Sequence, residues 1–76
     1  MSGKLPLMKA KDIAKILHKL GFVLRSQKGS HMFFEHSDGR TTVVPNHPAE
    51  HVDRHLLNKI IKKDCQITRE EFLKHR

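Results

Sequence analysis

Apolar residues in the first third of the chain recur with the spacing of one helix face. They fall at i, i+3, i+4 and i+7, at positions Ile13, Ile16, Leu17 and Leu20. This pattern predicts an amphipathic helix that begins near Met8. Gly21 follows directly and is the residue type that ends a helix in the left-handed conformation.

Three short runs rich in β-branched and aromatic residues come next, at Phe22 to Gln27, His31 to His36 and Arg40 to Val44. They are separated by Lys28-Gly29-Ser30 and by Ser37-Asp38-Gly39. Short connections with glycine join antiparallel neighbours, so the runs predict a three-stranded meander. Pro45 ends the third run because proline has no N–H to donate to a strand ladder.

Alternation divides the second run into two faces, one with His31, Phe33 and Glu35 and the other with Met32, Phe34 and His36. We expect Met32 and Phe34 to face the core. The opposite choice would bury the carboxylate of Glu35 together with His31, and burying an unpaired charge is costly.

A second helical face follows a loop around Asn46-His47-Pro48, with apolar residues at Leu56, Leu57, Ile60 and Ile61. Asp53 is placed to accept hydrogen bonds as its N-cap. A short last helix is indicated by Thr68-Arg69-Glu70-Glu71, which has the spacing of a capping box. The order of elements predicts an α+β fold in which helices cover one face of a three-stranded antiparallel sheet and leave the other face open.

Seventy-six residues suffice for one small domain. We interpret residues 1–7 as a flexible lead-in, partly anchored by Leu5 and Leu7, and residues 8–76 as a single domain. Hydrophobic residues make up 37% and charged residues 30%, a balance typical of a folded protein rather than a disordered one.

The chain is strongly basic, with 15 lysine and arginine residues against eight aspartate and glutamate residues and a net charge of +7. Such a surplus favours polyanionic partners, nucleic acid above all, although many small basic proteins merely carry a solvated lysine face. The single Cys65 cannot form an internal disulfide, which favours a reducing compartment. No apolar run approaches a membrane span of about 20 residues, and the N-terminus lacks a signal-peptide core, so we expect a cytoplasmic protein without a membrane partner.

The turn Lys28-Gly29-Ser30 delivers His31 to the first position of the second run. Histidine is the side chain that changes charge near neutral pH, so an imidazole beside basic residues suits proton transfer on a polyanion. His47, after the third run, is the candidate for a second proton transfer or a substrate contact. Lys28, Arg25 and Arg40 are predicted to flank His31 and to contact phosphates.

Simpler interpretations exist for the same residues. His31 can be an ordinary surface histidine, and Gly29 and Ser30 can be ordinary turn residues. His47, His51 and His55 recur every four residues and would align as metal ligands on one continuous helix, but Pro48 and the cap at Asp53 argue against such a helix. We therefore expect no metal and no other cofactor, and keep a non-catalytic RNA-binding module and a metal-binding or protein-interaction domain as alternatives.

A succession of motifs resembles the HicA family of toxins from prokaryotic toxin–antitoxin pairs over about residues 8 to 73. The motifs are Leu20-Gly21-Phe22, Arg25-Ser26-Gln27-Lys28-Gly29-Ser30-His31, Asp38-Gly39-Arg40, Thr42-Val43-Val44-Pro45-Asn46-His47 and Ile60-Ile61. Each motif alone is common, whereas this order at these separations is specific.

The resemblance implies a fold like that of double-stranded-RNA-binding domains, α-β-β-β-α, and a translation-independent endonuclease that cleaves messenger RNA. It also implies a HicB-type antitoxin as the partner that holds the toxin inactive. The family's catalytic histidine corresponds to His31, positioned by Gly29 and Ser30. The chain departs from the family where Arg54-His55-Leu56 replaces the usual Gly-Thr-Leu at the start of the last main helix.

Overall fold

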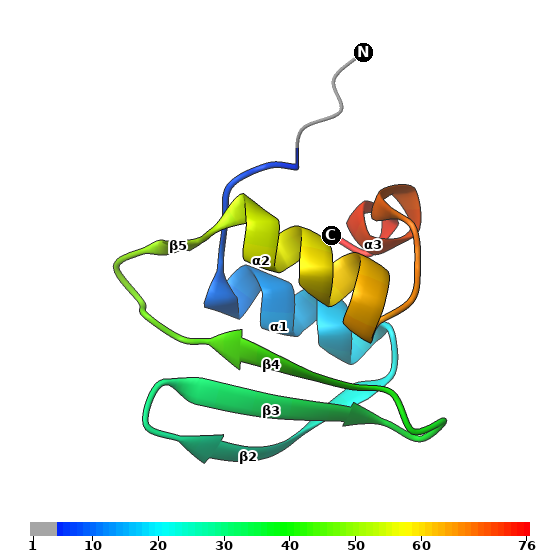
Figure 1. The fold of residues 1–76 in the computed structure, drawn as a ribbon, viewed down its shortest axis with the longest axis horizontal. Coiled ribbons are helices and arrows are strands. Elements are labelled where there is room, and N and C mark those ends of the chain that lie inside the picture. The colour runs from blue at the N-terminus through cyan, green and yellow to red at the C-terminus, as the bar shows by residue number, and fades with distance from the viewer. Residues whose placement is uncertain (1–4) are drawn as a thin grey trace.

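The computed structural model describes residues 5–76 and places a three-stranded antiparallel sheet beside a layer of helices (Figure 1). The elements in chain order are β1 (Met8–Lys9), α1 (Ala10–Lys19), β2 (Phe22–Lys28), β3 (His31–His36), β4 (Thr41–Pro45), β5 (His51–Val52), α2 (Arg54–Lys59), the π-helical segment η1 (Ile60–Asp64) and α3 (Arg69–Lys74). The sheet has the order β2-β3-β4. The predicted α+β class, with helices beside a three-stranded antiparallel meander and a short C-terminal helix, is confirmed.

Helix α1 presents the predicted apolar stripe to the core. Ile13, Ile16 and Leu17 are almost completely buried. The helix ends at Lys19 with Leu20 as its C-cap, and Gly21 adopts a φ of 100°, the left-handed region expected of a residue that ends a helix. The first helical residue is Ala10, two positions after the predicted start near Met8.

The three strands pair in the predicted antiparallel order, with Leu24 opposite Phe34 and Phe33 opposite Val43. A bulge at Arg25 shifts the register of β2. Met32 and Phe34 are 7% and 5% exposed, which confirms the predicted inward face of β3. Strand β4 ends at Pro45, which the sheet accommodates because β4 lies at its edge.

Two residues before α1 form a small second sheet that the sequence pattern did not predict. Met8 pairs with Val52, and Lys9 pairs with His51. The neighbouring Leu5 is buried, and its carbonyl oxygen accepts a hydrogen bond from Nε of Arg54 at 2.6 Å. The chain is therefore packed against the domain from Leu5 onward, whereas residues 1–4 of the expected lead-in lie outside the described residues.

The C-terminal helices begin at the predicted caps. Asp53 accepts hydrogen bonds from the backbone N–H groups of His55 at 3.0 Å and Leu56 at 3.3 Å. The hydroxyl of Thr68 accepts a hydrogen bond from the N–H of Glu71 at 3.0 Å. Between these caps the helix widens into the π-helical segment η1, which the apolar spacing alone did not indicate.

Arg40 fastens the turn between β3 and β4 to the end of η1. Its Nε donates to the carboxylate of Asp38 at 2.9 Å, and its Nη1 donates to the carbonyl oxygen of Cys65. The guanidinium also lies 5.3 Å from the centre of the Phe22 ring. Hydrogen bonds from Arg40 lower the pKa of the Asp38 carboxyl below its usual range.

Candidate functional site

His31 stands at the first position of β3, and its side chain is exposed. The turn before it depends on Gly29, whose φ of 57° is left-handed and favours glycine. Lys28 and Pro45 are its cross-strand partners on β2 and β4. The side chains of directly opposed residues point to the same face of a sheet. The side chains of Lys28 and His31 are therefore neighbours on the face that carries Phe33 and Glu35.

Ser30 joins the turn to the segment that leaves β4. Its carbonyl oxygen accepts a hydrogen bond from the backbone N–H of Asn46. This bond brings the start of β3 and the exit of β4 together, and His47 is the next residue along. The structure therefore places His47 at the same end of the sheet as His31. Within residues 5–76, neither imidazole takes part in a hydrogen bond or an ion pair with another protein group.

The sheet face that carries His31 also contains a hollow of about 340 Å³. It is lined by Arg25, Phe33, Phe34, Glu35, Thr41, Thr42 and Val43. The bulge directs Arg25 onto this face, where its Nε donates to Glu35 at 3.1 Å. Val23 and Val43 are 48% and 37% exposed, so the uncovered face combines basic and apolar groups. Such a combination suits a polyanion that also presents aromatic rings.

The expectation that Arg40 flanks His31 is wrong. His31 pairs with Pro45 at the end of β4, whereas Arg40 precedes Thr41 at the start of β4, beside Glu35. In an antiparallel pair the start of one strand lies beside the end of the other, which separates Arg40 from His31 by the length of the sheet. Its guanidinium is engaged by Asp38 and Cys65, and we assign it a structural role.

The three histidines spaced by four residues do not share a helix. Helix α2 begins at Arg54, so His47 precedes it in a loop and His51 lies in β5. In the part of the chain that the structure describes, no group of three or more His, Cys, Asp or Glu side chains is arranged to hold a metal ion. The arrangement of these histidines as one set of metal ligands is therefore not found.

Sequence reasoning missed a second hollow, of about 460 Å³, between α1 and the sheet. Its lining includes Asn46, the residue that bonds to Ser30, and Met32, the residue after His31. Lys11 and Lys15 of α1 also line it. No periodicity could reveal the hollow, because its walls come from three separate segments.

The fold and the histidine-bearing turn together define a small basic domain with an exposed imidazole on the open face of a three-stranded sheet. Residues 10–67 match the sequence model of a family described as HicA toxin of bacterial toxin–antitoxin. The match covers most of the chain, and the chain belongs to this family. A comparison with curated proteins finds no match. Among residues 5–76, none of the helices has the length and apolar character needed to cross a membrane.

Proposed function

We propose that this toxin is an endoribonuclease that cleaves messenger RNA without a metal ion, with His31 as its catalytic residue. The observation that carries the proposal is the placement of His31. Its exposed imidazole is at the first position of β3, directly after Gly29-Ser30 and opposite Lys28, in a chain with a net charge of +7. Membership of a toxin family supports the same conclusion.

The proposed reaction is an internal transfer at phosphorus. The RNA 2′-oxygen loses its proton to a base and forms a bond to the neighbouring phosphorus, while the bond from phosphorus to the 5′-oxygen breaks. An acid donates a proton to that leaving oxygen, and the products carry a cyclic phosphate and a 5′-hydroxyl. A positioned acid or base contributes about 10²- to 10⁴-fold to such a rate.

His31 supplies one of the two proton transfers in this scheme. His47 is the candidate for the other, since it lies at the same end of the sheet; this role requires its imidazole to lie within hydrogen-bond reach of the bound RNA. Lys28 neutralises the charge that develops on the phosphate. Arg25, which contacts Glu35 on the open face, positions the neighbouring RNA backbone.

The partner in this proposal is a HicB-type antitoxin that covers the open sheet face. Occupancy of the face around His31 and Phe33 excludes RNA without any change in the toxin. A partner that presents acidic groups would associate rapidly with a chain of net charge +7. Both toxin and antitoxin action are then expected in the cytoplasm, where messenger RNA is translated.

The test compares purified wild type with His31→Ala on a defined single-stranded RNA, with and without a chelator. His51→Ala is the matched control, because His51 is also exposed but lies in β5. We expect wild type and His51→Ala to cut equally in both buffers and His31→Ala to lose at least about 10²-fold in rate. Sequencing of the cut ends should locate discrete sites with 5′-hydroxyl products.

Three results would reject the proposal in different ways. Equal cutting by wild type and His31→Ala would remove His31 from the chemistry. RNA binding without cutting by any variant would instead indicate a non-catalytic RNA-binding module, and loss of cutting in chelator would indicate a metal-dependent enzyme.

A further inference from the structure

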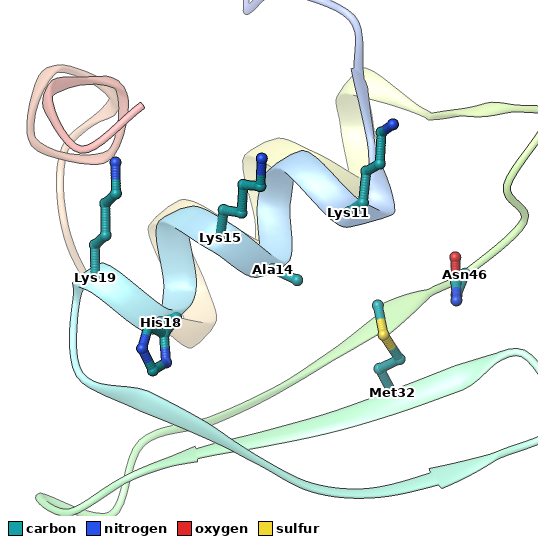
Figure 2. A pocket seen from close by; sticks show the side chains of 7 residues that line it. All are labelled: Lys11, Ala14, Lys15, His18, Lys19, Met32 and Asn46. Atoms are coloured by element: carbon teal, nitrogen blue, oxygen red, sulfur yellow. The ribbon is translucent and has the colours of Figure 1, made fainter.

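A hollow of about 460 Å³ opens between helix α1 and strand β3 (Figure 2). Its lining residues are Lys11, Ala14, Lys15, His18, Lys19, Met32 and Asn46. Figure 2 shows Ala14 and His18 on the side of α1 that faces the sheet, with Met32 rising toward them from β3. The volume falls within the roughly 300–1,000 Å³ of small-molecule pockets. Ala14 and Met32 make its walls largely apolar.

A row of lysines borders this hollow on its outer side. Lys11, Lys15 and Lys19 recur every four residues along α1, and all three are exposed. Across residues 5–76, none of the three forms an ion pair. Figure 2 shows their ammonium groups extending from the helix away from Met32. An apolar recess beside unpaired cations matches a nucleotide, whose base is flat and apolar on its faces and whose phosphate is charged.

The opposite wall carries a carboxamide suited to reading a base edge. Asn46 is half-buried, and its backbone N–H is used by the carbonyl of Ser30. Its side chain offers both a donor and an acceptor, and neither makes a hydrogen bond to another group of the described chain. Unpaired RNA bases are read through hydrogen bonds to their edges in this way.

The hollow lies close to His31 along the chain but on the other side of the sheet. Met32 directly follows His31, and Asn46 directly follows Pro45, the cross-strand partner of His31. Because successive side chains of a strand point to opposite faces, the hollow and the imidazole share one end of the sheet and face opposite ways. A ligand that reaches both must pass around this end of the sheet and must leave a base free to enter the recess. A flexible single strand meets both demands, whereas a duplex keeps its bases paired.

We propose that this hollow holds an unpaired base of a single-stranded RNA, one or a few nucleotides from the bond at His31, with the row of lysines on the adjoining phosphates. This inference rests on the proposed function and adds its substrate class. The toxin would then select single-stranded sites with a base preference on one side of the cut, set by Asn46 and by the shape of the recess.

The first test measures binding alone and does not depend on cleavage. In a His31→Ala background, the paired variant Lys11→Ala and Lys15→Ala is compared with Lys62→Ala and Lys63→Ala, which removes the same charge from exposed positions of η1. A fluorescent single-stranded oligoribonucleotide is titrated at several salt concentrations. We expect the α1 pair to weaken binding by roughly tenfold and to make the salt slope shallower by about 1.4, since each single-strand phosphate contact contributes about 0.7. The η1 pair should leave the slope unchanged.

The second test asks whether the recess selects a base. Asn46→Ala removes the carboxamide, and Ala14→Leu fills the recess, with Ala49→Leu as a control at an exposed loop position. Each protein digests a pool of single-stranded RNA with randomised sequence, and unfolding midpoints show that the variants fold. We expect Asn46→Ala to flatten the preference at one position near the cut and Ala14→Leu to slow cleavage by roughly tenfold, the size of one lost base contact. Ala49→Leu should behave as wild type.

The outcomes separate this inference from the proposed function. If His31→Ala abolishes cutting while Asn46→Ala and Ala14→Leu retain the wild-type preference and rate, the recess does not hold a base and the nuclease proposal stands. If wild type cuts no RNA, the nuclease proposal fails, and equal binding by the two lysine pairs would overturn the recess as well. Loss of antitoxin affinity in Ala14→Leu with unchanged RNA binding and cleavage would also overturn it, in favour of a protein side chain as the occupant.

Discussion

The two turns of the β2-β3-β4 meander, at residues 29–30 and 37–40, both contain a glycine with positive φ, but their side chains are used differently. At the turn before β4, Arg40 binds Asp38 and the carbonyl of Cys65, and the hydroxyl of Thr42 donates to Asp64 at 2.8 Å. At the turn before β3, the side chains of Lys28 and His31 are exposed. One turn holds the sheet to the helices, and the other leaves basic groups available to a ligand.

The largest effect on stability is expected at the turn before β4. Arg40→Ala removes a charged donor and leaves the Cys65 carbonyl unpaired, so we expect the free energy of unfolding to fall by about 2–3 kcal/mol. His31→Ala, at the other turn, should change it by less than about 0.5 kcal/mol because the side chain is exposed. Urea denaturation measures both.

Arg25→Ala is the matched arginine control for Arg40→Ala. Its pair with Glu35 is exposed, with 60% and 46% of the two side chains accessible, so we expect a loss below about 1 kcal/mol. If Arg40→Ala proved as mild as Arg25→Ala, the contrast between the two turns would not hold.

A smaller effect is expected from Gly21, which precedes the strand residue opposite His36. Gly21 and Gly39 share a φ of 100°, but a Cβ at Gly21 would lie 2.8 Å from Nε2 of His36, whereas a Cβ at Gly39 meets nothing within 4 Å. Both alanine variants carry a backbone strain of about 1–2 kcal/mol. Only Gly21→Ala must also displace the imidazole of His36, so its unfolding midpoint in urea should be the lower of the two. Equal midpoints would show that His36 moves freely.

The thiol of Cys65, whose carbonyl anchors Arg40, provides a pH-dependent test. Burial raises the pKa of Cys65 to about 11 from an ordinary value of 9.0. Between these values the unfolded chain loses the thiol proton while the folded chain keeps it, so stability should fall as pH rises from about 9 to about 11.

The comparison protein for this titration is Cys65→Ala, which lacks the thiol but shares every lysine that titrates in the same range. The difference in unfolding free energy between the two proteins should decline with pH over this window. A difference that stays constant would mean that the thiol is accessible in the folded protein, and alkylation under native conditions would then be fast.

The smallest expected effect lies at Lys28, beside His31. Lys28→Ala should make the salt dependence of single-stranded RNA binding shallower by about 0.7, the contribution of one phosphate contact. Lys63→Ala, an exposed lysine of η1, should leave the slope unchanged. Identical slopes for the two variants would place Lys28 outside the RNA-contacting surface.

Features that depend on residues two to four positions apart could be predicted from the sequence alone. The burial of Ile13, Ile16 and Leu17, the inward face of Met32 and Phe34, and the caps at Asp53 and Thr68 all follow from local spacing. So does the adjacency of Lys28 and His31, because a short turn makes them cross-strand partners. His31, the central residue of the candidate site, could therefore be identified from the sequence.

Which distant segments meet depends on how the helices and strands pack on one another. The pairing of Met8 with Val52 involves two-residue strands, too short for any periodicity to predict. The recess between α1 and Asn46 exists only because three separate segments pack around it. The separation of Arg40 from His31, by contrast, follows from the antiparallel order of the predicted meander. Local patterns fix the conformation of a segment, whereas the packing of one segment on another sets which side chains remain open to a ligand.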